Sequence, residues 1–184
     1  MKKRLYQFVF FNLMGWKIEG TIDQSIQKCV MIVVPHTSWH DFYLGIFTRA
    51  ILRLEMNFVA KKELFRFPFG FYFKWMGGAA LDRTGGLNRV EAIAKLFEQR
   101  KTFRLAIAPE GTRKKVTEWK TGFYYISLQA KVPIVPVAFD WGLKTVRLDK
   151  PFYPSGNLEH DLPLLQAYFK NVKGKVPENS FEVA

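Results

Sequence analysis

The sequence predicts an α/β fold: a single domain with a largely parallel or mixed central β-sheet flanked by helices, after a short amphipathic N-terminal segment. Three observations predict it. The chain has 184 residues, which is the size of one domain. Its composition, 48% hydrophobic and 24% charged, is typical of a globular protein and excludes a disordered polymer. Short β-prone apolar runs alternate with segments of helical periodicity, as in α/β layers.

The N-terminal segment, residues 1–20, is basic and amphipathic. Three cations at residues 2–4 precede Leu5, Phe8, Val9 and Leu13, which recur at helical spacing. Such a stretch either packs on its own domain or lies in a membrane interface. No apolar run reaches the roughly 18–20 residues that span a bilayer. Residues 21–174 form the main domain, and residues 175–184 are expected to be a polar tail.

Strands and helices are predicted in alternation along the main domain. The predicted strands are Cys29–Val34, Asn57–Ala60, Ala79–Leu81, Phe103–Ala108, Ile134–Phe139 and Thr145–Leu148. The first helix follows the turn at residues 35–38 and carries Phe42, Ile46, Ala50 and Leu54 along one side. The other predicted helices are Leu87–Arg100, Gly122–Ala130 and Leu162–Phe169.

Charge and cysteine usage restrict the function. The chain has 28 Lys and Arg against 16 Asp and Glu, a net charge of +12, so anionic partners are expected. The single cysteine, Cys29, excludes an internal disulfide and a cysteine-based metal cage and favours a reducing compartment. The three histidines are scattered, so no metal is expected. The basic residues are dispersed without a recognition-helix, RNA-binding or zinc-finger signature, so nucleic acid is not the expected partner.

His36 and Asp41 follow the first buried strand. Ser38 is a plausible helix N-cap, which places Asp41 at the third helical position, with its carboxylate able to reach back toward His36. A carboxylate that holds an imidazole is what a general base needs. The same residues also fit a capping box, and Asp41 suits a helix N-terminus without any catalysis. His40 and His160 fit packed, capping or surface roles.

A second group of candidates follows the strand at residues 103–108. The turn Pro109-Glu110-Gly111-Thr112-Arg113 combines a glycine, which allows close backbone approach, with a guanidinium suited to phosphate or carboxylate. Asp82-Arg83 precedes a second glycine-rich turn at another strand end. Either the two arginines share one anion pocket, or each pairs with a neighbouring acid.

Four blocks in this order resemble the glycerolipid acyltransferase family, which includes bacterial 1-acyl-sn-glycerol-3-phosphate acyltransferases. They are His36-x4-Asp41, residues 59–83 with Lys61 and Arg83, the Pro109–Arg113 turn with Lys120-Thr121-Gly122, and Val132–Val137. The resemblance covers roughly residues 30 to 140 and makes residues 21–174 the acyltransferase domain. Pro35 and Ala108 depart from the asparagine and phenylalanine common in the family, and the N-terminal segment is short.

The resemblance implies roles for residues in these blocks. His36 would be the general base and Asp41 its orienting partner, and the acceptor hydroxyl would attack the thioester directly, without an acyl-enzyme or a cofactor. The residues implied to hold the acceptor are Arg83, Glu110, Gly111, Thr112 and Arg113, with Lys61 and Lys120 adding positive charge.

The resemblance also implies substrates and a location. The donor would be acyl-CoA or an acidic acyl-carrier protein, and the lysolipid acceptor 1-acyl-glycerol-3-phosphate. The alternatives are a phosphate-free acceptor such as a lyso-amino-acid lipid, or a family member that binds lipid without catalysis. The enzyme would be cytoplasmic and peripheral on the inner face of the cell membrane, in contact with its anionic surface. The aromatic segment Leu64–Met76 would line an acyl channel or contact lipid, or else pack against the sheet.

Overall fold

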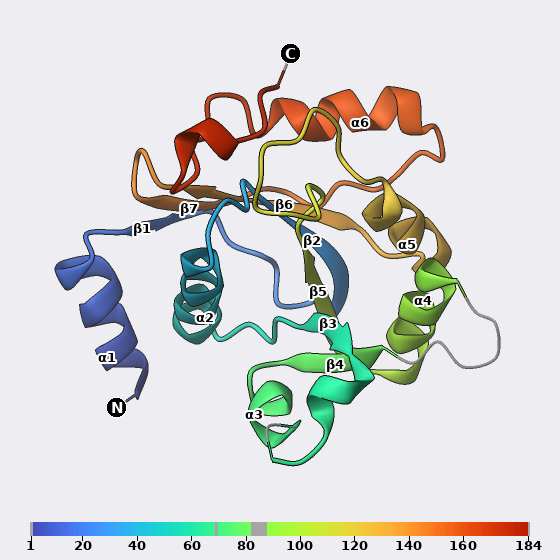
Figure 1. The fold of residues 1–184 in the computed structure, drawn as a ribbon, viewed down its shortest axis with the longest axis horizontal. Helices are drawn as coiled ribbons and strands as arrows, with labels where there is room; N and C mark the ends of the chain where they lie inside the picture. The colour runs from blue at the N-terminus through green and yellow to red at the C-terminus, as the bar shows by residue number, and fades with distance from the viewer. Residues whose placement is uncertain (1, 69, 82–87, 184) are drawn as a thin grey trace.

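Five strands form the central sheet of the computed structural model, which describes residues 2–68, 70–81 and 88–183 (Figure 1). Across the sheet the strands are β1 (Lys17–Glu19), β7 (Thr145–Leu148), β6 (Ile134–Asp140), β2 (Lys28–Val34) and β5 (Phe103–Ile107). The β6–β7 pair is antiparallel and the other pairs are parallel. The sheet is therefore mixed, and the predicted fold class is confirmed.

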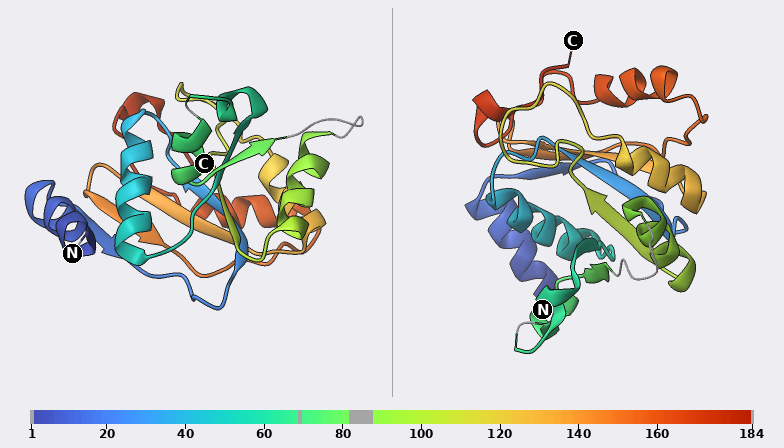
Figure 2. Two further views of the ribbon diagram at one scale, coloured as in Figure 1. Left: turned by 90° about the horizontal axis from the view of Figure 1, so that it is seen from below. Right: turned by 45° about the vertical axis from the view of Figure 1, so that its right-hand side comes forward.

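Both faces of the central sheet are covered by helices. Successive side chains of a strand point to opposite faces, so each central strand contributes to two cores. In β2, Val30, Ile32 and Val34 enter one hydrophobic core, whereas Cys29 and Met31 enter the other. This double burial explains why β2 is apolar without alternation. The first core is closed by α4 (Arg89–Gln99), α5 (Gly122–Ala130) and α6 (Leu158–Ala167), and the second by α2 (His40–Leu52) and the N-terminal helical segment (Figure 2).

A small lobe at the bottom of Figure 1 contains the remaining strands. Strand β3 (Phe58–Lys61) pairs in parallel with β4 (Gly78–Leu81) and forms a separate two-stranded sheet. The segment between them contains a 3₁₀ turn, η2 (Lys62–Phe65), and helix α3 (Gly70–Trp75). Both strands were predicted, but their pairing apart from the central sheet was not.

The ends of the chain pack on the domain. Helix α1 (Lys2–Gln7) continues into a π-helical turn, η1 (Phe8–Leu13), and Phe10 is fully buried. Strand β1, which was not predicted, follows this segment and pairs with β7 at the edge of the central sheet. At the other end, Phe181 packs on Trp119, just after the 3₁₀ turn η4 (Pro177–Asn179). None of the helices in the described part of the chain has the length and apolar character needed to cross a membrane.

Three helices begin elsewhere than predicted, and α4 does so by two residues, because Asn88 caps it and Arg89 is its first residue. Helix α2 starts at His40 with Trp39 as its N-cap, so Ser38 lies one residue further out than expected. Helix α6 starts at Leu158, four residues before the predicted start, because the Asn157 side chain accepts a hydrogen bond from the His160 amide and caps it.

Candidate active site

The candidate site is built from the loops that follow three neighbouring parallel strands. Strand β2 lies between β5 and β6 and runs parallel to both, so the carboxyl ends of the three strands meet at one edge of the sheet. The loop after β2 carries His36, the loop after β5 carries Glu110, and Trp141 directly follows β6. Loops at this edge are where α/β sheets bind ligands.

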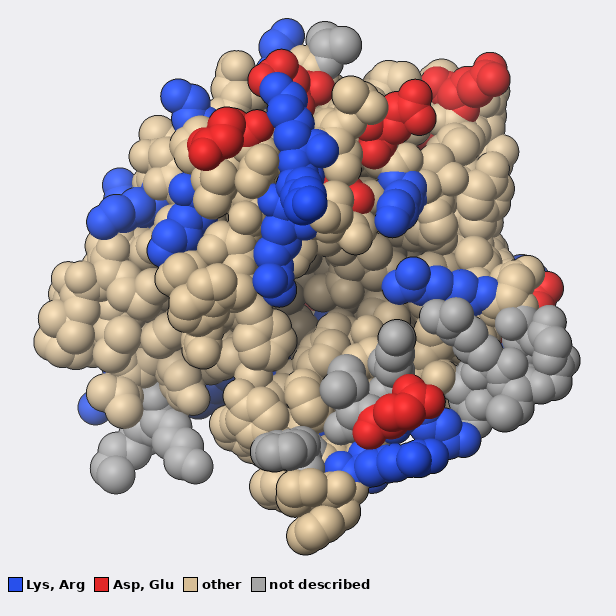
Figure 3. Space-filling view, viewed as in Figure 1, with Lys and Arg blue, Asp and Glu red and all other residues tan. Residues whose placement is uncertain are grey.

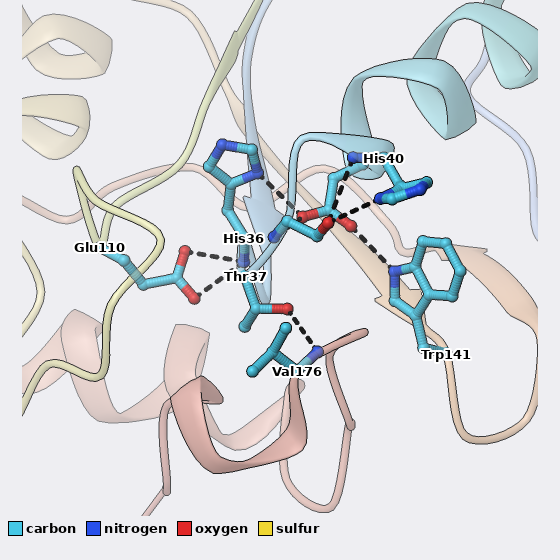
Figure 4. A network of polar contacts seen from close by, with 8 residues as sticks. His36, Thr37, His40, Glu110, Trp141 and Val176 are labelled. Carbon is cyan, nitrogen blue, oxygen red and sulfur yellow. Dashed lines mark hydrogen bonds and ion pairs between the residues drawn. The ribbon is translucent and has the colours of Figure 1, made fainter.

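His36 and Asp41 form the predicted pair. The His36 Nδ1 atom lies 3.1 Å from Asp41 Oδ2, and the Asp41 side chain is buried whereas that of His36 is 26% exposed. A carboxylate only accepts hydrogen bonds, so Nδ1 carries a proton, and in the neutral imidazole Nε2 then has a free lone pair. Figure 4 shows that the far side of the ring points away from Asp41. The pair therefore presents an imidazole that can accept a proton.

Asp41 is fixed through both of its carboxylate oxygens. Oδ2 also accepts the backbone N–H of Ser38 at 2.9 Å, and Oδ1 accepts the indole N–H of Trp141 at 2.8 Å. Ser38 lies one residue before the N-cap Trp39, so this contact joins Asp41 to the loop before α2 and is not the predicted capping box. His40 takes no part in the pair: its Nδ1 lies 2.9 Å from Ser38 Oγ and its ring packs on Trp39.

Glu110 is a buried carboxylate that supports the loop of His36. The His36 backbone N–H lies 3.0 Å from Oε1 and 3.1 Å from Oε2, and Glu110 is only 2% exposed. Burial raises the pKa of Glu110 to about 7, with a smaller contribution from the Asp41 charge, while the His36 amide opposes the rise. The resemblance placed Glu110 with the acceptor, whereas its described contact is with the backbone of His36.

A cavity of about 300 Å³ opens next to the pair. Its lining combines His36, Asp41, Arg49 and Arg113 with largely apolar side chains, among them Phe42, Ile46, Met56, Phe58, Met76 and Phe139. The helical stripe predicted from Phe42 and Ile46 therefore forms a cavity wall, while the core-facing stripe of α2 is Leu44, Thr48 and Ile51. A mainly apolar cavity with one imidazole and two guanidinium groups fits a lipid with an anionic head.

The remaining predicted residues are less closely grouped. Gly111 has φ +65°, and a side chain there would meet that of Lys120, so these two lie together. Thr112 is exposed, and its hydroxyl accepts the Lys114 amide at 3.3 Å. Lys61 ends β3, but its side chain lies outside the described part of the structure, as does the whole of Arg83.

Sequence reasoning missed Trp141 and the contact of Glu110 with His36. Trp141 lies 100 positions from Asp41, and Glu110 lies 74 positions from His36, so no local spacing relates them. Their position was still a usable signal, because each closely follows a predicted strand whose end meets that of β2 if the strands are parallel.

Comparison with known proteins matches the part of the chain that contains this site. Residues 17–140, which contain both members of the His36–Asp41 pair and Glu110, match the acyltransferase family. The chain belongs to the acyltransferase family. The human 1-acyl-sn-glycerol-3-phosphate acyltransferase beta is 32% identical over 141 residues, which are 73% of this chain and 49% of that protein. The Cocos nucifera 1-acyl-sn-glycerol-3-phosphate acyltransferase is 35% identical over 145 residues, 72% of this chain and 46% of that protein.

The fold agrees with this membership. The crystal structure of the 1-acyl-sn-glycerophosphate acyltransferase PlsC from Thermotoga maritima superposes with a TM-score of 0.58 and 18% identity, over 90% of this chain and 74% of that one. This acyltransferase chain spans about half the length of the curated relatives described above. The predicted resemblance and its family are confirmed, and the roles of individual residues stay predictions.

Proposed function

We propose that this acyltransferase transfers a fatty acyl group from acyl-CoA or acyl-carrier protein to the free hydroxyl of 1-acyl-glycerol-3-phosphate, giving phosphatidate. The observation that carries the proposal is the His36–Asp41 pair at 3.1 Å, open to a mainly apolar cavity that Arg113 also lines. The names of the human and coconut relatives support the choice of acceptor.

In the proposed reaction His36 is the general base. Its Nε2 removes the acceptor's hydroxyl proton as the oxygen attacks the thioester carbon, and Asp41 stabilises the imidazolium that forms. The carbon–sulfur bond then breaks, and the departing sulfur takes the proton from His36. Hydroxyl and thioester become ester and thiol, so atoms and charges balance without any cofactor.

Cys29, the one cysteine of the chain, supports direct transfer over an acyl-cysteine intermediate. It lies in the middle layer of the fold on β2 and is fully buried. Burial raises the pKa of its thiol to about 12, against a weaker opposing effect of Arg104. A thiol becomes a nucleophile only as the thiolate, so Cys29 is a core residue.

Positive charge near the cavity supports anionic substrates. Figure 3 shows Lys and Arg side chains gathered around a hollow on the face seen in Figure 1. Arg113 lines the cavity itself, and its planar guanidinium suits the acceptor phosphate. We propose that Lys120, which lies over Gly111, adds to this field, and that the donor's phosphates or the acidic surface of a carrier protein meet the same face.

Exposed aromatic side chains of the small lobe support peripheral contact with a membrane. Phe67 is 97% exposed, Phe71 80% and Trp75 62%, and the cations Arg66 and Lys74 lie in the same segment. Aromatic rings beside cations suit the interface of an anionic bilayer. Met76, the next residue after Trp75, lines the cavity, so a lipid acceptor would have a short path to the site. A location on the cytoplasmic face of the cell membrane stays a prediction.

Thiol release from palmitoyl-CoA tests the proposal, with lysophosphatidate, other lysophospholipids and lyso-amino-acid lipids as separate acceptors. We expect release with lysophosphatidate that is lost in His36→Ala. Arg113→Ala should raise the KM for lysophosphatidate by about tenfold or more, as expected for a lost charged hydrogen bond. Lys150→Ala, which removes an exposed cation from the loop after β7, is the charge-matched control.

Each other outcome has a defined meaning. Release only with a phosphate-free acceptor would keep the chemistry and overturn the role of Arg113. An Arg113→Ala variant in which only the KM for the acyl donor changes would also overturn the role of Arg113. Silence with every acceptor, from both acyl-CoA and acyl-carrier protein, would refute the proposed activity and leave a lipid-binding family member.

A further inference from the structure

Trp141 makes a contact with the His36–Asp41 pair that the family match does not include. It is the first residue after β6, and its indole N–H donates to Asp41 Oδ1 at 2.8 Å (Figure 4). The other carboxylate oxygen, Oδ2, faces His36 and the Ser38 amide. The matched residues end at 140, so Trp141 lies just outside them.

A short C-terminal segment, residues 173–176, holds Trp141 in place. The Trp141 backbone N–H donates to the Lys173 carbonyl at 2.8 Å, and the Lys175 ammonium lies 4.8 Å from the centre of the Trp141 ring. The ring also packs edge-on against Trp16, with 5.0 Å between centroids. Trp141 is thus fixed from both ends of the chain.

The same segment contacts the loop that carries His36. The Val176 amide donates to Thr37 Oγ1 at 3.1 Å. A side chain at Gly174 would lie 2.5 Å from the same hydroxyl, so the backbone approaches Thr37 as closely as only glycine allows. Residues 173–176 therefore contact two neighbours of the pair: Thr37, which follows His36 in the chain, and Trp141, which binds Asp41.

We propose that Trp141 is a positioning residue for the His36–Asp41 pair, and that residues 173–176 hold both Trp141 and Thr37 in register with it. The proposal rests on the proposed function, because it assigns Trp141 a role in that reaction. A carboxylate that keeps His36 in one tautomer must itself be unable to rotate. With the Trp141 N–H on one oxygen and the Ser38 N–H on the other, the buried Asp41 has one orientation in which both are satisfied.

A purely structural role makes a different prediction. If Trp141 only fills space, Trp141→Phe, which keeps an aromatic ring and removes the N–H, should cost stability without a specific loss of turnover. If Trp141 positions Asp41, the same change should lower kcat and leave the KM of both substrates nearly unchanged, because the interaction acts on the base rather than on binding.

Trp119→Phe is the matched control. Trp119 is buried, whereas Trp141 is half-buried, and the Trp119 indole nitrogen has no hydrogen-bond partner among the described residues. It packs on Phe123, Phe169 and Phe181. We expect Trp141→Phe to lower kcat about 10- to 100-fold, the range for a lost hydrogen bond to a charged group, and Trp119→Phe to change kcat less than about threefold. Equal kcat losses in the two variants would overturn the proposal.

Thr37 supplies a second pair of variants. Thr37→Val removes the oxygen that Val176 contacts and keeps the side chain's shape, whereas Thr37→Ser keeps the oxygen. We expect Thr37→Val to lower kcat by about 3- to 10-fold and Thr37→Ser to retain it, as for a neutral hydrogen bond. A loss of the same size in both variants would show that residues 173–176 do not act through this contact.

Nuclear magnetic resonance of the tryptophan indoles separates failure of this inference from failure of the proposed function. The Trp141 indole signal is assigned by its absence in Trp141→Phe. We expect it to move in Asp41→Asn and in His36→Ala, while the Trp119 signal stays fixed. An unresponsive Trp141 signal would refute the coupling even in an active enzyme. A responsive signal in a protein that transfers no acyl group would refute the proposed function alone.

Discussion

The described part of the molecule contains two His–Asp pairs with almost the same separation, and one of them lies at the candidate site. His36 Nδ1 is 3.1 Å from Asp41, and His160 Nδ1 is 3.0 Å from Asp161. Both aspartates are buried. The histidines differ: the side chain of His36 is 26% exposed and lines the cavity, whereas that of His160 is 65% exposed at the start of α6.

The partners of each aspartate explain the difference. Asp161 accepts the Tyr124 hydroxyl at 2.8 Å and both the amide and the hydroxyl of Ser155, so it ties α5 to the loop before α6. Burial alone would raise the pKa of Asp161, but these hydrogen bonds and the one from His160 lower it to about 2. The contacts of Asp41 instead fix the orientation of one imidazole beside a cavity. A short His–Asp distance therefore does not define a catalytic pair.

Replacing each histidine in turn should give the largest difference in activity between the two pairs. We expect His36→Ala to lower kcat/KM for acyl transfer by about 10²- to 10⁴-fold, the range for a general base. His160→Ala should keep activity within about twofold, because His160 is exposed to solvent and does not line the cavity. Steady-state thiol release measures both variants, and urea unfolding confirms that both are folded. Near-wild-type turnover in folded His36→Ala would remove the general-base assignment.

Replacing the two aspartates should affect two different properties, activity for Asp41 and stability for Asp161. Asp41→Asn should lower kcat by about 10²-fold or more, since an amide in place of the carboxylate no longer fixes the His36 tautomer. Asp161→Asn should instead lower the free energy of unfolding by about 1.5–3 kcal/mol at pH 7, the range for hydrogen bonds to a charged group. Its activity should be unchanged below the unfolding transition.

The pH dependence of the Asp161 contribution has a defined sign. The pKa of Asp161 falls from 3.8 to about 2 on folding, so its stabilisation is present above pH 3.8 and is lost as the pH falls toward 2. The stability difference between wild type and Asp161→Asn should therefore shrink between those values. A constant difference from pH 7 down to pH 3 would contradict this account.

Local patterns predicted the parts of the molecule that local physics determines. The apolar run of β2 and the spacing of His36 and Asp41 lie within a short stretch of chain, and the structure contains both. The pairing of β3 with β4 and the position of Trp141 depend on segments far apart in sequence, and the sequence analysis did not predict them. The Phe42 and Ile46 stripe was visible, but periodicity shows only that a helix has an apolar face, not whether core or cavity meets it.

Glu110 gives the His36 pair a second buried carboxylate, and its replacement should lower kcat less than replacement of His36 or Asp41. Glu110→Gln keeps one oxygen to accept the His36 amide, so we expect kcat to fall by no more than about tenfold. Stability should respond to pH, because burial raises the pKa of Glu110 from 4.5 to about 7, with His36 and Asp41 as the charged groups acting on it. The folded state then binds a proton that the unfolded state has lost.

The sign of this effect is opposite to that of Asp161. The Glu110 contribution is fully present below pH 4.5 and is lost as the pH rises through about 7, so wild-type stability should decline across that range. Glu110→Gln, which does not titrate, should flatten the decline, whereas Asp161→Asn should leave it intact. Urea unfolding of the three proteins at pH 4.5, 6 and 8 measures this. An equally steep decline in stability in Glu110→Gln would mean that a group other than the Glu110 carboxylate causes the pH dependence.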